Sequence, residues 1–209
     1  MTPDSWEDRY RVGDTPWDVG APDKHLTGFV EARGTGKGRV LEVGCGTGTN
    51  ALWLAGRGYQ VTAVDLSQLA VEKARAKAPS GATCTFARLD FLAEEPPGGP
   101  FDLVFDRGCF HVFDEPADRR RFAERVASLL APGGHWLSLI GSTDGPERDS
   151  GPPRRSARDV TDAVEPVLEL VELRRVSFQD ARAAPHAPLA WFALARRREL
   201  PAQPSTRLT

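Results

Sequence analysis

Hydrophobic and polar positions along the chain follow two periods, one typical of buried β-strands and one typical of amphipathic helices. Short runs rich in β-branched and aromatic residues predict seven strands, at residues 38–43, 59–65, 84–88, 101–105, 135–140, 168–179 and 189–196. Helical patterns occur after residue 48, at about 67–78, at about 116–130 and near 156–164. Strands that alternate with helices predict an α/β fold, with a parallel sheet covered on both faces. The last two strands are close enough in sequence to form an antiparallel hairpin.

Length and charge narrow the class of protein. The chain has 209 residues, which favours one large domain, and its formal net charge of -2 gives no reason to expect a nucleic-acid partner. No apolar run approaches the roughly 18 residues that a membrane span needs, and the N-terminus lacks the features of a secretory signal. We therefore expect a soluble, cytoplasmic protein without a membrane partner, either a monomer or a homodimer. The scattered Cys45, Cys84 and Cys109 predict reduced thiols and no metal site.

The most informative motif is Glu42-Val43-Gly44-Cys45-Gly46-Thr47-Gly48, where the first predicted strand gives way to a helix. Its three glycines remove the Cβ atoms that would keep a ligand away from the backbone, and two of them can adopt positive φ. A dinucleotide-binding motif would place its last glycine where Thr49 stands. The spacing therefore favours a nucleoside ligand without phosphates over a nicotinamide dinucleotide.

Two further acidic residues follow the next two predicted strands. Asp65 lies about 20 residues after the glycine motif, where open α/β sheets place the carboxylate that binds ribose hydroxyls. Asp90 follows the third strand, and with Phe91 it could accept a hydrogen bond from an adenine amino group and pack against the ring. Each acid alone could cap a loop. Their order at the carboxyl ends of successive strands predicts a nucleoside site.

These motifs, together with Phe101-Asp102-Leu103-Val104 and Leu130-Ala131-Pro132-Gly133-Gly134, resemble the class I S-adenosylmethionine-dependent methyltransferases. The resemblance runs from about Gly38 to Arg196. It implies a Rossmann-like, mostly parallel sheet of seven strands in the order 3-2-1-4-5-7-6, with strand 7 antiparallel. It also implies S-adenosyl-L-methionine as cofactor, with the glycine turn under its methionine part, Asp65 on the ribose, and Asp90 with Phe91 at the adenine.

A narrower resemblance comes from Trp6-Glu7-Asp8-Arg9-Tyr10 and Gly13-Asp14-Thr15-Pro16-Trp17-Asp18, which are similar to the segment before the core in the thiopurine and halide/thiol methyltransferase group. In that group this segment folds over cofactor and substrate. Trp17 could cover the sulfonium; alternatively, Trp6 and Trp17 only anchor a helix to the core. The expected organisation is an N-terminal helical cap (1–37), a methyltransferase domain (38–198) and a flexible tail (199–209).

The resemblance also assigns the end of the fourth predicted strand to the site. Asp106 or its backbone carbonyl could meet the cofactor's amino group, and His111 is a candidate general base or a polar residue that shapes the pocket. The expected substrate pocket comprises Tyr10, Arg107, Phe110 and His111. The cofactor-binding residues expected on this basis are Trp17, Glu42, Gly44, Cys45, Gly46, Gly48, Asp65, Leu66, Asp90, Phe91 and Asp106.

The function predicted from these resemblances is methyl transfer to a small-molecule nucleophile, either a sulfur or a phenolic oxygen. The sulfur part rests on the N-terminal segment. A thiol with a pKa of about 8.5 needs a base less than a phenol with a pKa near 10. Two alternatives remain open at this point: a nicotinamide-linked oxidoreductase and a non-catalytic protein that binds a nucleoside cofactor.

Overall fold

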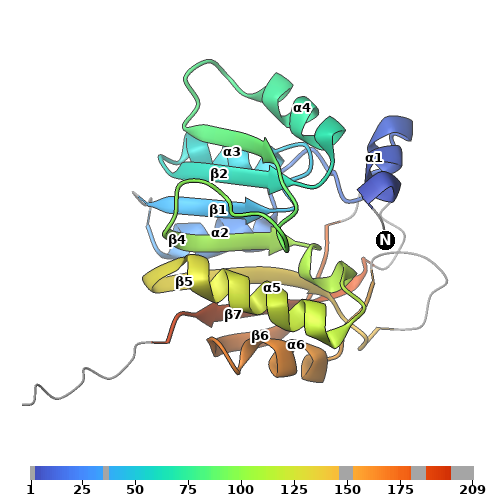
Figure 1. Ribbon diagram of the computed structural model, residues 1–209, viewed down its shortest axis with the longest axis vertical. Helices are drawn as coiled ribbons and strands as arrows, with labels where there is room; N and C mark the ends of the chain where they lie inside the picture. Colours follow the sequence, from blue (N-terminus) through green and yellow to red (C-terminus); the bar gives the residue numbers. More distant parts are fainter. Residues whose placement is uncertain (1–2, 35–37, 146–152, 180–186, 199–209) are drawn as a thin grey trace, which may run out of the picture.

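The computed structural model describes residues 3–34, 38–145, 153–179 and 187–198, and places seven strands in one sheet (Figure 1). The strand order is β3-β2-β1-β4-β5-β7-β6, with β7 antiparallel to both of its neighbours. This order confirms the predicted fold class and the predicted hairpin. The strands are β1 (Arg39–Val43), β2 (Gln60–Asp65), β3 (Cys84–Arg88), β4 (Phe101–Arg107), β5 (Leu130–Gly141), β6 (Glu169–Ser177) and β7 (Leu189–Arg196).

Helices cover both faces of the sheet and form two apolar cores. The helices are α1 (Pro3–Val12), α2 (Lys24–Ala32), α3 (Thr49–Gly56), α4 (Gln68–Lys77), the 3-10 turn η1 (Phe110–Val112), α5 (Pro116–Leu129) and α6 (Ala157–Val164). α5 and α6 pack on one face through residues such as Phe122 and Val160, whereas α2, α3 and α4 pack on the other through Leu26, Leu54 and Val71. None of the helices in the described ranges is long and apolar enough to cross a bilayer.

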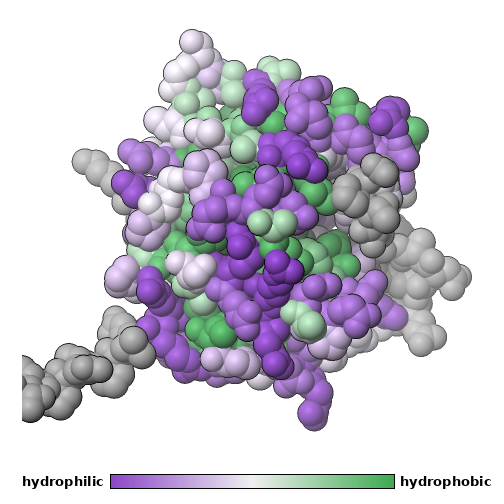
Figure 2. Space-filling model, viewed as in Figure 1, coloured by the Kyte–Doolittle hydropathy of each residue, from purple (hydrophilic) through white to green (hydrophobic). Residues whose placement is uncertain are grey.

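Helix α1 packs on neither face of the sheet. It contacts α4 and lies beyond the carboxyl ends of the central parallel strands (Figure 1). Ser67 is the N-cap residue of α4, and its hydroxyl accepts a hydrogen bond from the Ala70 amide at 3.1 Å. The view in Figure 2, which has α5 and α6 in front, shows mainly hydrophilic side chains over the centre and lower part of this face. The apolar stripes of these helices are therefore turned toward the sheet.

The main correction to the predicted boundaries concerns the start of β5. The sequence predicts a helix to about residue 130 and a strand from 135, but α5 ends at Leu129 and β5 already begins at Leu130. Leu130 pairs with Phe101, and the register then shifts before the regular pairing at His135. A Cβ at Gly134 would lie 2.9 Å from the Phe101 carbonyl oxygen, so the glycine at this position makes the close approach possible. The predicted tail, 199–209, lies outside the described residues.

Candidate cofactor and methyl-transfer site

The glycine turn between β1 and α3 has positive φ at Gly44, Gly46 and Gly48. Positive φ was predicted for two of these three glycines. At Gly48 a Cβ would lie within 2.9 Å of Phe86 and Ala74 side-chain atoms, so this glycine allows α3 and its neighbours to pack. At Gly46 a Cβ would lie 2.9 Å from the Tyr10 hydroxyl. The turn therefore exposes backbone toward the N-terminal segment, where a ligand can approach it closely.

Asp65 at the end of β2 is joined to this turn. Its Oδ2 accepts from the Gly46 amide at 2.8 Å, and its Oδ1 accepts from the Ser67 amide at 2.9 Å. Burial raises the pKa of this carboxyl, while the backbone donors act in the opposite direction. Each carboxylate oxygen has a second lone pair, so the side chain is oriented and still able to accept hydrogen bonds from hydroxyls.

Glu42 in β1 is a buried acid with one unpartnered oxygen. Its Oε1 accepts from Asn50 Nδ2 at 3.0 Å, whereas Oε2 has no hydrogen-bond partner among the described residues. Burial raises the pKa of Glu42 to about 8, although the Asn50 hydrogen bond works against this rise. An unsatisfied buried carboxyl oxygen is costly, and a cationic or donor group brought to it would remove that cost.

A small cavity of about 50 Å³ lies between the glycine turn and the N-terminal segment. Predicted site residues that line it are Trp17, Glu42, Gly44, Cys45, Gly46 and Arg107. Lining residues that the sequence reasoning did not select are Asp18, Val19, Ala21, Asp23, Thr47, Thr49, Asn50 and Gln179. Asp18 could have been found from its place beside Trp17 in Thr15-Pro16-Trp17-Asp18. Asp23 and Gln179 carry no local sequence signal, because the fold brings them here from distant segments.

The N-terminal segment closes the site with an aromatic cluster made of Trp6, Tyr10 and Trp17. Trp17 Nε1 donates to the Tyr10 hydroxyl at 3.2 Å, and the Trp6 and Trp17 rings meet edge to face at 5.5 Å between centroids. The Arg9 guanidinium lies 4.4 Å from the Trp17 ring centroid. Tyr10 is buried. The tryptophans therefore anchor α1, as the second alternative predicted, and Trp17 also lines the cavity. That Trp17 covers the sulfonium stays a prediction.

Polar contacts fix this segment to the core at two further places. The Glu7 carboxylate accepts from the Ser67 hydroxyl at 2.5 Å and from the Leu69 amide at 3.3 Å, both at the start of α4. The Asp18 carboxylate accepts from the Thr47 hydroxyl of the glycine turn at 2.6 Å. A negative side chain at a helix N-terminus is electrostatically favoured. The segment is therefore attached directly to the elements that form the predicted cofactor site.

Arg107 at the end of β4 joins three segments. Its Nε donates to Asp23 Oδ2 at 2.9 Å, and its two terminal nitrogens donate to the backbone oxygens of Trp17 and Gln179. The guanidinium also lies 5.1 Å from the Phe178 ring centroid. Arg107 was predicted to line the substrate pocket; the structure places it at the cavity with much of its hydrogen-bonding capacity used to hold the surrounding segments.

The carboxylate of Asp106 holds η1 rather than facing the cavity. Its Oδ2 accepts from the Cys109 and Phe110 amides at 3.2 and 3.0 Å, and its Oδ1 accepts from Trp136 Nε1 at 2.9 Å. The side chain is fully buried. Of the two contacts predicted for Asp106, the one through its carboxylate does not fit this arrangement, because that group already supports the turn after β4.

Phe110 and His111 are the first two residues of η1, and both are buried. The Phe110 ring packs edge to face on Phe122 and Trp136, in the core and not among the cavity-lining residues. His111 Nδ1 accepts from the Gly141 amide at 2.7 Å. A neutral imidazole that accepts through Nδ1 carries its proton on Nε2 and has no free lone pair for a second proton. This geometry favours the reading of His111 as a residue that shapes the pocket over its reading as general base.

The residues predicted at the adenine are in the turn after β3. Asp90 Oδ1 accepts from the Leu92 amide at 3.0 Å, which makes Asp90 a turn-forming residue as well. The Phe91 ring packs on Phe122 at 4.7 Å between centroids and is buried. Leu66 is half-buried, next to Asp65. None of the three lines the 50 Å³ cavity, so the cavity corresponds to the glycine-turn part of the predicted site only.

Comparisons with known proteins identify the family. The family model described as thiopurine S-methyltransferase matches residues 1–191. Probable thiol methyltransferase 2 of Arabidopsis thaliana is 38% identical over 151 residues, which are 71% of this chain and 65% of that protein. Thiocyanate methyltransferase 1 of Brassica oleracea is 32% identical over 178 residues, 84% of this chain and 76% of that protein.

A solved structure described as "Conversion of a Disulfide Bond into a Thioacetal Group during Echinomycin Biosynthesis" is 30% identical, with a TM-score of 0.80 over 94% of this chain and 92% of that one. The family match confirms the predicted resemblance, and at the level of the family it also confirms the enzyme class and the cofactor. It excludes the nicotinamide-linked oxidoreductase. The chain belongs to the thiopurine S-methyltransferase family.

Proposed function

We propose that the protein transfers the methyl group of S-adenosyl-L-methionine to a sulfur atom of a small-molecule acceptor. The observation that carries this proposal is the family match from residue 1 to 191, which includes the N-terminal aromatic segment as well as the sheet. The relatives at 38% and 32% identity are named for thiol and thiocyanate methylation. Phenolic oxygen, the other acceptor that the sequence allowed, has less support.

The residues around the glycine turn fit this cofactor. The unpartnered Oε2 of Glu42 would accept from the cofactor's ammonium group, and Gly44 to Gly46 would lie against its methionine part. Asp65 would accept from the ribose hydroxyls, and Asp90 and Phe91 stay the candidates for the adenine. The aromatic cluster would cover the cationic sulfur, because ring faces attract cations. When bound, the cofactor supplies an electrophilic methyl carbon.

The protein's contribution to the reaction is positioning. In-line displacement needs the acceptor lone pair and the methyl carbon held collinear, and such orientation supplies up to roughly 7–11 kcal/mol of the barrier. Arg107 holds the segments around the cavity, and Asp106 holds η1 beside it. The hydrogen bond from Gly141 occupies the Nδ1 lone pair of His111, so His111 does not act as the base in this arrangement. A thiol acceptor needs a base less than a phenol does, because a few per cent of it is already ionised near neutral pH.

The test is turnover of a matched acceptor panel, with S-adenosylhomocysteine formation measured by liquid chromatography and mass spectrometry. Thiophenol, phenol and aniline share one ring and differ in the reacting atom. We expect methylation of thiophenol and little of the other two. Methylation of phenol with thiophenol inert would contradict the proposal. Micromolar cofactor binding without turnover of these acceptors or of an aliphatic thiol would favour the remaining alternative, a non-catalytic binding protein.

A further inference from the structure

A second cavity lies outside the cofactor site, between α2 and the strands β6 and β7. Its volume is about 270 Å³, just below the roughly 300–1,000 Å³ typical of small-molecule pockets. We call it the α2–β7 groove. Its lining includes the cationic side chains of Lys24, Arg33 and Arg174, the rings of Phe29 and Phe192, and the backbone of Gly28. No motif of the sequence analysis and no part of the proposed function uses these residues.

The groove has an excess of positive charge. Within the described ranges, neither Lys24 nor Arg33 forms an ion pair, whereas Arg174 donates to Glu172 at 2.7 Å. Three cationic side chains therefore face one carboxylate in the lining. Arg33 also acts on His135, which packs on Phe29: burial lowers the pKa of His135, and Arg33 and Arg196, the latter outside the groove lining, lower it further. A positive potential in a concave site attracts anions.

Two of the cations are held in place by aromatic rings. The Arg33 guanidinium carbon lies 3.8 Å from the Phe29 ring centroid, and that of Arg174 lies 4.1 Å from the Phe192 ring centroid. A guanidinium that stacks by its face keeps its N–H groups in the plane, free to donate to a carboxylate. The stacking also reduces the side-chain entropy that a ligand would otherwise have to remove.

A glycine keeps the helix wall of the groove open. Gly28 lies in the middle of α2, where glycine is a poorer helix former than alanine. A Cβ built at this position meets no atom within 4 Å, so packing does not require a glycine here. A side chain at position 28 would instead project into the groove that Gly28 lines. The open space beside Gly28 therefore forms part of the groove.

We propose that the α2–β7 groove is a binding site for a small organic anion with a flat aromatic body, of the aromatic carboxylate class. In this proposal the carboxylate lies between the in-plane N–H groups of Arg33 and Arg174, and the ring lies over Gly28 and the apolar side chains that line the groove, Phe29, Phe192 and Leu194. The inference does not depend on the proposed methyl transfer, because the groove shares no lining residue with the cavity at the glycine turn.

The test uses 4-fluorobenzoate as the probe and fluorine NMR line broadening as the measurement of binding. The neutral 4-fluorobenzamide has nearly the same shape and serves as the matched ligand. We expect saturable binding of the carboxylate by the full-length protein, and binding at least about tenfold weaker for the amide, which lacks the charge-assisted hydrogen bonds. Equal binding of the two ligands, or no binding of the carboxylate, would overturn the proposal.

Two variants test whether the probe binds in the groove. Gly28→Leu should fill it and abolish probe binding, and it should keep or raise the melting temperature because leucine is the better helix former. The double variant Arg33→Gln and Arg174→Gln should weaken binding by about tenfold or more. Arg57→Gln is the matched control, since Arg57 also stacks on a ring, that of Trp53 at 4.8 Å, but lies outside the groove. Unchanged binding in Gly28→Leu would place the probe elsewhere and reject the site.

Discussion

The carboxyl of Glu42 should make the stability of the fold depend on pH. Its pKa is raised to about 8 in the folded chain, so the folded state holds this proton more tightly than the unfolded state does. Its contribution to stability is complete below a pH of about 4.5 and is lost as the pH rises toward 8. We therefore expect the wild-type protein to lose stability over this range on account of Glu42.

The variant Glu42→Gln isolates this effect, because glutamine keeps an oxygen for the Asn50 hydrogen bond but has no charge to lose. Relative to wild type, its free energy of unfolding should rise by on the order of 3–5 kcal/mol between pH 5 and pH 9. Urea denaturation at a series of pH values measures the difference. Parallel curves for the two proteins would mean that Glu42 is ionised at neutral pH in spite of its burial.

Asp65 should contribute to cofactor affinity, because it is the acid oriented by the glycine turn. The Asp65→Ala variant is expected to weaken S-adenosylhomocysteine binding by about 1–3 kcal/mol, since ribose hydroxyls would lose their acceptor. Asp102→Ala is the matched control: Asp102 also accepts from a backbone amide, that of Arg39 at 2.8 Å, but it lies at the opposite end of the sheet. Calorimetric titration that gives the same dissociation constant for Asp65→Ala and wild type would remove Asp65 from the site.

At the scale of elements, the contact of α1 with α4 should control how fast the cofactor leaves. Glu7 makes one part of this contact, with the first turn of α4, and Lys73 of α4 makes another by donating to the Tyr10 backbone oxygen at 2.5 Å. Glu7→Gln should therefore loosen α1 and raise the dissociation rate of S-adenosylhomocysteine by roughly fivefold to tenfold. Stopped-flow fluorescence of the tryptophans in the aromatic cluster measures this rate. Asp8→Asn is the control, because Asp8 pairs with Arg11 on the same helix. Equal rates in the two variants would show that α1 does not gate the site.

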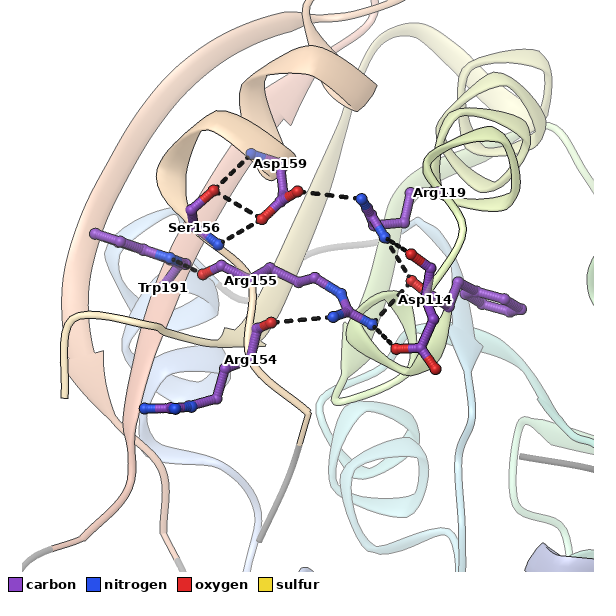
Figure 3. Close-up of polar contacts among 8 residues, drawn as sticks. Asp114, Arg119, Arg154, Arg155, Ser156, Asp159 and Trp191 are labelled. Atoms are coloured by element: carbon purple, nitrogen blue, oxygen red, sulfur yellow. Dashed lines mark hydrogen bonds and ion pairs between the residues drawn. The ribbon is translucent and has the colours of Figure 1, made fainter. Parts of the chain in front are cut away.

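A second polar cluster joins the N-terminus of α6 to the segment between η1 and α5 (Figure 3). The buried Arg119 donates to the backbone oxygens of Phe113 and Asp114 at 2.8 and 2.6 Å, and to Asp159 Oδ1 at 3.1 Å. Arg119→Met should cost about 2–4 kcal/mol of unfolding free energy, because two carbonyls and a carboxylate lose a donor. The exposed Arg120→Met should change it by less than about 0.5 kcal/mol. Denaturant titration measures the unfolding free energy of both variants. Equal values for the two would contradict the structural role of Arg119.

At the scale of the whole molecule, the strand order implied by the family resemblance is confirmed, and the glycine turn was found from its own residues, whereas the roles of individual side chains were predicted less well. Motifs at the ends of β1 and β2 are local, and therefore the backbone pattern and Asp65 could be placed from spacing alone. The roles of Asp106 and Phe110 could not be predicted in this way. Both depend on contacts with Trp136, which is distant in the sequence and is brought close only when β5 pairs with β4, and no local pattern indicates these contacts. The same holds for the hydrogen bond from Gly141 that fixes His111.

The distribution of the core leads to a last prediction about the N-terminal segment. The two apolar cores begin at Leu26, and before that residue Tyr10 is the one buried apolar side chain among the described residues. A variant that starts at residue 21 should therefore fold cooperatively and melt within several degrees of wild type. It should bind S-adenosylhomocysteine at least about tenfold more weakly, a loss of about 1.4 kcal/mol, because the aromatic cluster and Asp18 are removed from the cavity.

Circular dichroism melting and calorimetric titration test both halves of this prediction, with a variant lacking residues 199–209 as the truncation control. An unfolded short variant would mean that the segment is part of the core rather than a cover over the site. A folded short variant with wild-type affinity would mean that the cofactor site is complete without the aromatic cluster. Only retained folding together with weakened binding agrees with a segment whose contacts are concentrated on α4, the glycine turn and Arg107.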